Sequence, residues 1–231
     1  MKKYYFFKIK TFTLCSLFLF IFFIGSSFSS LNYLDTTEKK LFVVVIDAGH
    51  GGYDVGNECS DLQRFKQEKD LVLPVALQLG GYLENLLENV KVVYTRKDDI
   101  FVSLEDRAKI ANDASADLFI SIHANHNPIK SIYGAQVHIH NHDIKFSKIF
   151  AKKLMKQLSE RAKRKVLKLQ TTADRGHNLF VLQNTKMPAI LVELGFMSNG
   201  SEEVYLNSEY GQTILASAIF RAVREYREVV Q

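Results

Sequence analysis

The sequence predicts a single α/β domain, with a twisted, mostly parallel sheet of about six strands and helices on both faces. Short apolar, β-branched runs alternate along the chain with stretches in which apolar residues recur every three or four positions. Most of these runs are unbroken, as in strands that are buried on both faces of a parallel sheet. The 231 residues, 47% of them hydrophobic, suffice for one well-cored domain but not for two.

The first predicted strand leads directly to a candidate functional residue. Residues 41–52 read LFVVVIDAGHGG, so an apolar run ends in an acid and a histidine flanked by glycines. Open α/β sheets bind ligands beyond the carboxyl ends of their strands, which is where this pattern places His50. The neighbouring glycines leave room for a ligand to approach the backbone closely.

The remaining elements follow from the same two patterns. Apolar runs predict further strands at Lys91–Thr95, Asp117–Ala124, Tyr133–His140, Asn178–Leu182 and Ala189–Glu193. Apolar residues at helical spacing predict helices at 68–90, from Ser103 to about Ala114, at Asp143–Lys165 and from about Ser208 to Val229. We therefore expect residues 41–231 to form one folded domain.

Residues 1–30 differ in composition from the rest of the chain. Four lysines precede an apolar run from about Thr11 to Ile24, and small residues follow as far as Ser30. This order is typical of a secretory signal peptide. The run is short for a membrane span, which needs ~20 apolar residues, but residues 4–24 together could form an uncleaved N-terminal anchor. Both interpretations export the domain across a membrane, with residues 31–40 as a polar lead-in.

Charge and cysteine content exclude two classes of protein. The chain has 30 basic and 25 acidic side chains, but its first 30 residues hold four lysines and no acid, so the remainder carries 26 against 25. We therefore expect no nucleic-acid partner, and the sequence contains no helix-turn-helix, zinc-finger or aromatic RNA-binding pattern. Outside the export segment the only cysteine is Cys59, which excludes a domain held together by internal disulfides.

Three predicted strands end in residues suited to metal binding or acid–base chemistry. His50, His123 and Glu193 each follow an apolar run, and Glu68 opens the first predicted helix. Because the carboxyl ends of parallel strands meet at one edge of a sheet, these four side chains can converge. Two imidazoles and one carboxylate that leave a fourth position open are typical of a catalytic zinc site, and the other carboxylate is free to act as a base.

Four short motifs contain these residues. IDAGHGG occupies residues 46–52, a Glu-Lys pair opens a helix at 68–69, SIHAN occupies 121–125 and VELGFMSN occupies 192–199. In this order they resemble the motifs of the zinc-dependent N-acetylmuramoyl-L-alanine amidases of bacterial cell walls, the amidase 3 family. The family motif has proline where this chain has Ala48, a change in backbone stiffness rather than in chemistry. The likeness extends over residues 41–229, and four blocks in order are highly specific.

The resemblance implies a role for each of the four residues. His50, Glu68 and His123 would hold one Zn²⁺ per chain, and Glu193 would take a proton from the attacking water and pass it to the leaving amine. The substrate would be peptidoglycan, cleaved at the amide between N-acetylmuramic acid and the L-alanine of the stem peptide. Residues 41–231 would then be a zinc amidase domain in the periplasm or cell envelope of a bacterium.

Other polar residues are weaker candidates for the site. Asn125, His177 and Arg107 are candidate substrate contacts, although Arg107 is more readily explained as a buttress of the site. His126 is interpreted as a solvated loop histidine rather than as an additional ligand. The remaining histidines are interpreted as an exposed strand face: His138, His140 and His142.

Two other functions are consistent with the same sequence. A zinc peptidase, acting as a carboxypeptidase or an endopeptidase within stem peptides, would use the same site on a different amide. A non-catalytic wall-binding protein would keep the fold, although such a protein would typically have lost one of the four chemical residues.

The spacing between motifs also bears on regulation. Seventy residues separate His123 from Glu193, whereas activator-controlled members of the family carry a longer insertion there, with a helix that blocks the zinc. We therefore expect no self-blocking helix, no obligatory activator and a monomer. An acid from residues 141–175 placed on the metal site would contradict this expectation.

Overall fold

The computed structural model describes residues 40–141 and 144–231. The unit Lys40–Gln231 is compact by itself and contains its own hydrophobic clusters. The predicted signal peptide or anchor, and all of the lead-in except Lys40, lie outside the described residues. Within the described part, no helix combines the length and the apolar character that crossing a membrane requires.

A five-stranded sheet forms the centre of the domain, in the order β2-β1-β3-β5-β4. The strands β2, β1, β3 and β5 are parallel to their neighbours, and β4 is antiparallel to β5. Their bounds are β1 Phe42–Ala48, β2 Val90–Tyr94, β3 Leu118–Asn125, β4 Gln136–His138 and β5 Ala189–Phe196. The mostly parallel sheet predicted from the unbroken apolar runs is confirmed.

One predicted strand is wrong. Residues 178–182 do not join the sheet, because the segment forms the short helix α6, Phe180–Asn184, whose Val181 and Leu182 are buried. Both edges of β5 are already paired, with β3 and β4. The run LFVL is too short for its periodicity to distinguish a strand from one turn of a buried helix.

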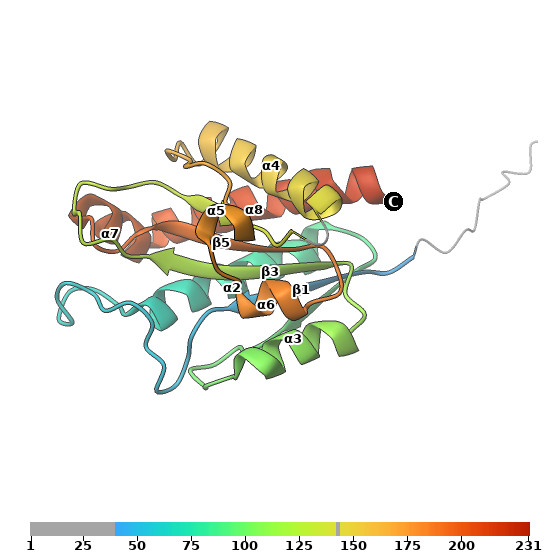
Figure 1. Cartoon of the computed structure of the whole chain (residues 1–231), viewed down its shortest axis with the longest axis horizontal. Helices are drawn as coiled ribbons and strands as arrows, with labels where there is room; N and C mark the ends of the chain where they lie inside the picture. Colours follow the sequence, from blue (N-terminus) through green and yellow to red (C-terminus); the bar gives the residue numbers. More distant parts are fainter. Residues whose placement is uncertain (1–39, 142–143) are drawn as a thin grey trace, which may run out of the picture. The chain divides into compact units, whose positions relative to one another are not determined.

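Helices cover both faces of the sheet (Figure 1). On one face α2, α8 and α4 pack side by side, and on the other α3 packs against α6. Their bounds are α2 Glu68–Leu86, α3 Leu104–Asp113, α4 Ile144–Glu160, α5 Thr172–Arg175, α7 Gly200–Asn207 and α8 Glu209–Val230. The predicted helices are present, but α4 ends five residues before Lys165, and α7, which Asn199 caps through its side chain, was not predicted.

Successive side chains of a strand point to opposite faces of the sheet, so position along the strand decides the face on which each polar side chain lies. Val44, Ile46, Ile120 and Val192 belong to the larger hydrophobic cluster under α2, α4 and α8. Their neighbours Val45, Phe119 and Leu191 belong to the smaller cluster under α3 and α6. The alternation therefore directs the side chains of Asp47, Ser121, His123 and Glu193 to the α3–α6 face of the sheet.

Candidate metal centre and active site

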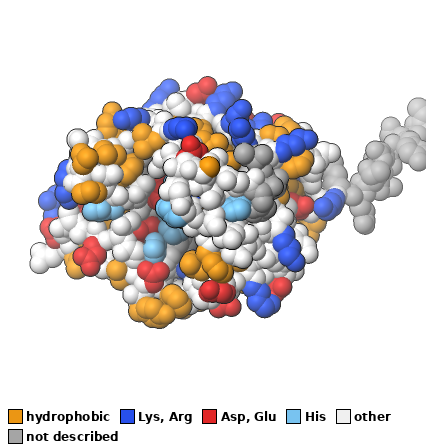
Figure 2. Space-filling model, viewed as in Figure 1, with side chains coloured by type: hydrophobic (Ala, Val, Ile, Leu, Met, Phe, Trp, Pro, Cys, Tyr) orange, Lys and Arg blue, Asp and Glu red, His pale blue; other side chains and the backbone are white. Residues whose placement is uncertain are grey.

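The structure brings the four predicted site residues to one edge of the sheet. His50 follows β1, His123 lies near the end of β3, and Glu193 lies on β5 directly opposite His123 in the strand register. Glu68 is the first residue of α2. Histidine and acidic side chains gather in the middle of the face shown in Figure 2.

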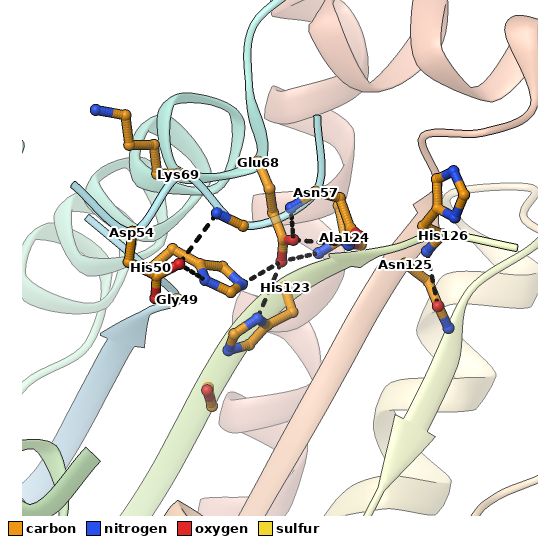
Figure 3. Close-up of polar contacts among 12 residues, drawn as sticks. Gly49, His50, Asp54, Asn57, Glu68, Lys69, His123, Ala124, Asn125 and His126 are labelled. Carbon is orange, nitrogen blue, oxygen red and sulfur yellow. Dashed lines mark hydrogen bonds and ion pairs between the residues drawn. The ribbon is translucent and has the colours of Figure 1, made fainter. Parts of the chain in front are cut away.

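Three of these side chains point toward one another (Figure 3). Nε2 of His50 lies 3.2 Å from Oε1 of Glu68, and Nδ1 of His123 lies 3.0 Å from the same oxygen. One potential ligand atom from each residue lies within 4.8 Å of the others. Tetrahedral ligands with bonds of about 2.1 Å stand about 3.4 Å apart. The two imidazoles and the carboxylate therefore fit a zinc ion in chemistry and in spacing.

The charges of this cluster favour a cation at its centre. Burial raises the pKa of Glu68, but hydrogen bonds with His123 and His50 lower it by more, so the carboxylate stays ionised. Burial lowers the pKa of His123, but the hydrogen bond with Glu68 and the charge of Glu68 raise it by more, to about 8. The pKa of His50 is raised in the same way. In the metal-free protein the His123 imidazole therefore holds a proton at neutral pH, which a metal ion would displace.

Two glycines permit the close approach of His50, Glu68 and His123. A Cβ atom on Gly49 would lie 2.3 Å from Cε1 of His123. A Cβ atom on Gly56, whose φ is +68°, would lie 2.7 Å from Oε2 of Glu68 and 2.6 Å from Cδ2 of His50. His50 itself has a φ of +59°, a conformation that non-glycine residues seldom adopt away from turns and functional sites.

The loop between β1 and α2 orients His50 and Glu68 through two residues that the sequence analysis missed. Oδ1 of Asp54 lies 2.9 Å from Nδ1 of His50, which turns Nε2 toward Glu68. Asn57 donates to Oε2 of Glu68 from its backbone nitrogen, at 2.9 Å, and from Nδ2, at 2.8 Å. Such partners fix the orientation of metal ligands. The sequence signal for Asp54 was its position four residues after His50 in a glycine-rich turn.

A buried polar network supports the turn that carries His50. Asp47, 1% exposed, accepts hydrogen bonds from Thr95 Oγ1, Ser121 Oγ and Arg107 Nη1. Burial raises the pKa of Asp47, but Arg107 and Ser121 lower it by more. Arg107 also donates to the carbonyl oxygens of Ala48 and His50, both at 2.7 Å. Arg107, 3% exposed, thus lies beneath the turn that carries His50 and buttresses it.

Glu193 has the environment of an acid–base group. Its Oε2 is buried and has no hydrogen-bond partner in the described part of the chain. Burial raises the pKa of Glu193 to about 7. The carboxyl group can therefore exchange a proton near neutral pH, next to the strand that holds His123.

The other candidates lie outside the ligand cluster. Figure 3 shows Asn125 and His126 apart from it, and Oδ1 of Asn125 accepts from the backbone nitrogen of His126. His177 is exposed, and its Nδ1 lies 3.2 Å from the carbonyl oxygen of Arg175. His138 was interpreted as exposed, but it is only 8% exposed. Burial and the neighbouring Arg175 lower its pKa to about 4, because the strand turns this side chain toward the protein.

Comparison with known sequences identifies similar proteins over most of the chain. Residues 44–225 match the amidase 3 family, which is described as N-acetylmuramoyl-L-alanine amidase. The germination-specific N-acetylmuramoyl-L-alanine amidase of Bacillus subtilis (strain 168) is 30% identical over 198 residues, which cover 80% of this chain and 79% of that protein.

Solved structures show the same fold. The N-acetylmuramoyl-L-alanine amidase from Clostridium difficile 630 has a TM-score of 0.74 at 34% identity, over 82% of this chain and 98% of that one. The CwlD amidase from Clostridioides difficile, solved in complex with the GerS lipoprotein, has a TM-score of 0.73 at 27% identity, over 81% of this chain and 99% of that one.

Proposed function

This chain belongs to the amidase 3 family of N-acetylmuramoyl-L-alanine amidases, and from that membership we propose how its own residues carry out the reaction. The protein is a peptidoglycan hydrolase that cleaves the amide between N-acetylmuramic acid and the L-alanine of the stem peptide. The single observation that supports the mechanism best is the convergence of ligand atoms from His50, Glu68 and His123 within 4.8 Å. Beside them lies Oε2 of Glu193, which has no hydrogen-bond partner among the described residues.

His50, Glu68 and His123 hold one zinc ion per chain. The spacing of their ligand atoms, the ionised state of Glu68 and the support from Asp54 and Asn57 favour this assignment. When bound, zinc polarises the scissile carbonyl and lowers the pKa of a water molecule so that it can attack at neutral pH. The protein contributes ligands that are already oriented before the metal binds.

Glu193 is the general base and then the general acid. Its carboxylate takes a proton from the attacking water and delivers that proton to the nitrogen of the departing L-alanine. A single group suits both steps because its pKa of about 7 allows it to accept and to donate near neutral pH. Asn125 and His177 are proposed substrate contacts, because both have polar side chains that are at least partly exposed.

We further propose that the protein acts as an exported monomer without an obligatory activator. The basic and apolar pattern of residues 1–30 supports export to the periplasm or cell envelope. Between the end of β3 and the start of β5, the structure describes two acidic residues. Glu160 is exposed at the end of α4, and Asp174 pairs with Lys168. Neither arrangement resembles an acid placed on the metal.

Product analysis tests the proposed bond. Residues 40–231 would be incubated with purified sacculi, with and without a zinc chelator, and the products identified by mass spectrometry. Free stem peptides that begin with L-alanine, absent when chelator is added, are expected. Shortened stems that stay attached to the glycan would instead show a zinc peptidase. No product from protein that binds zinc stoichiometrically would contradict the proposal that no activator is needed.

A further inference from the structure

The charge of the folded domain is concentrated in one segment. Residues 144–168 carry ten lysine or arginine side chains and one acid, whereas residues 40–143 and 169–231 together carry fifteen basic and 22 acidic ones. Residues 144–168 therefore carry a net charge of +9, and the rest of the domain carries a net charge of −7. Figure 2 shows blue side chains along the upper edge of the molecule, over α4 in Figure 1.

Most of these charges face solvent without an opposite charge beside them. Lys148, Lys152, Lys156 and Arg161 are exposed, and none of them forms an ion pair with an acidic residue of the described chain. The exceptions in the segment are Arg164, which pairs with Glu202, and Lys168, which pairs with Asp174. The opposite side of α4 is apolar and packs into the core. We call the exposed lysine and arginine side chains of residues 144–168 that form no ion pair the basic surface.

The basic surface lies away from the catalytic residues. The buried side of α4 joins the cluster under α2 and α8, while Glu193 and His123 are directed to the other face of the sheet. The first turn of α4 lies at the amino edge of the sheet, because Ser147 Oγ accepts from the backbone nitrogen of Ala189, where β5 begins. The basic surface therefore lies apart from the residues proposed to bind the metal and transfer the proton.

Lys40, the first residue that the structure describes, lies at the same edge of the sheet. Lys40 precedes β1, and its carbonyl oxygen accepts from the side chain of Gln231 at the end of α8. The sequence before Lys40 contains the apolar run from about Thr11 to Ile24. At the start of α4, Phe146 is 38% exposed beside Lys145, whose Nζ lies 5.1 Å from the ring centroid. An aromatic ring next to lysines suits the boundary between lipid headgroups and acyl chains.

We propose that the basic surface lies against an anionic lipid membrane and holds the domain there with its active site turned away from the lipid. Lysines on one side of an exposed helix gain favourable energy near anionic headgroups, and this attraction declines with ionic strength. A polybasic surface is also the second signal that a single weak apolar anchor needs for stable membrane association. This inference is independent of the catalytic assignment.

Vesicle flotation with residues 40–231 tests the proposal. Vesicles of phosphatidylcholine alone would be compared with vesicles that also contain phosphatidylglycerol. We expect binding to the anionic vesicles only. The affinity for these vesicles should fall more than about tenfold as NaCl is raised from about 0.05 to 0.5 M. Equal binding to both kinds of vesicle, or binding that salt does not weaken, would overturn the proposal.

A matched pair of variants separates the basic surface from net charge. The test variant carries Lys148→Glu, Lys152→Glu, Lys156→Glu and Arg161→Glu. The control carries four reversals at exposed lysines elsewhere: Lys66→Glu, Lys91→Glu, Lys97→Glu and Lys186→Glu. Both variants change the net charge equally. We expect the first to lose affinity for anionic vesicles by more than about 100-fold and the control to stay within about tenfold of wild type.

Two further readouts keep the result decisive. Circular dichroism and zinc stoichiometry should be unchanged in both variants, because the reversed residues are exposed and lie outside the ligand cluster. Equal losses in the two variants would show a net-charge effect and overturn the proposal. Tighter binding of the wild type to soluble polyglycerol phosphate than to anionic vesicles would assign the basic surface to a wall polymer instead.

Discussion

Asn57 donates two hydrogen bonds to the same carboxylate oxygen of Glu68, one from its backbone nitrogen and one from its side-chain amide. The same amide also donates to the carbonyl oxygen of Ala124, at 2.8 Å, on the strand that carries His123. Asn57 therefore joins the loop after β1, the start of α2 and the end of β3. The ligand geometry depends on this loop as well as on the strand ends.

Replacing the Asn57 side chain should weaken metal binding without unfolding the protein. Asn57→Ala removes the amide but keeps the backbone donor, and loss of such a supporting partner typically costs 10–100-fold in metal affinity. Competition with a chromogenic chelator measures the zinc affinity. Asn85→Ala is the control, because Asn85 also donates from its side chain, to Gly81 on the exposed side of α2. Equal zinc affinity in the two variants would contradict the role of Asn57.

Gly56 should be required for zinc binding because of the space it leaves. In Gly56→Ala the new Cβ would contact Glu68 and His50 at less than 3 Å, so we expect zinc affinity to fall more than about tenfold. Gly176→Ala is a matched control, since Gly176 has a φ of +76° but nothing within 4 Å of its added Cβ. Both variants should lose about 1 kcal/mol of stability from backbone strain. Retained zinc affinity in Gly56→Ala would show that the steric argument is wrong.

Zinc affinity should fall as the pH falls. His123 has a raised pKa of about 8 in the metal-free protein, so below that pH zinc must displace a proton from its ring. Titration calorimetry between about pH 6.5 and 8.5, in buffers of different ionisation enthalpy, should show proton release and weaker binding at the lower pH. An affinity that is independent of pH over this range would exclude His123 as a ligand.

The same pKa shift predicts the opposite trend for stability without metal. Protonated His123 is stabilised by Glu68 in the folded state, so its contribution is fully present below the ordinary pKa of 6.5 and is lost as the pH rises through about 8. Urea unfolding of the metal-free protein, compared with a His123→Asn variant, should show a stability difference that narrows over this range. A difference that widens with pH would contradict the assignment.

Arg107 should matter for stability more than for substrate affinity. Arg107→Met leaves the buried Asp47 carboxylate without its cation, a change that typically costs about 3–5 kcal/mol. The control Lys109→Met removes an exposed lysine from the same helix, paired with Asp113, and should cost less than about 1 kcal/mol. Urea unfolding measures both. A stable Arg107→Met variant with an increased KM would restore Arg107 as a substrate contact.

Local patterns in the sequence were sufficient to predict that the four candidate residues lie near one another. An apolar run that ends at a histidine or an acid defines a buried strand and its carboxyl end together, and parallel strands share that edge. His50, His123 and Glu193 could therefore be placed near one another without knowledge of the loops. The start of a helical pattern made Glu68 a further candidate, and only the resemblance to the amidase 3 family distinguished it from Glu193 as a metal ligand.

What the sequence did not predict depends on contacts between distant segments. Asn57 lies in a loop without periodicity, and its role appears only when that loop folds over Glu68 and Ala124. The buried His138 lies 3.4 Å from Nη1 of Arg175, which is 37 residues away in the sequence. The segment around Val181 forms a helix because its apolar residues meet the cluster under α3, which no local pattern reveals.

The central claim is that Glu193 performs proton transfer and takes no part in holding the metal. The most direct test measures zinc stoichiometry and turnover of sacculi together for Glu193→Gln, with Glu160→Gln as the control for an exposed acid. We predict one zinc per chain in both variants and a loss of kcat by about 10²–10⁴-fold in Glu193→Gln alone. Loss of zinc from Glu193→Gln, or turnover close to that of the wild type, would contradict the proposed mechanism.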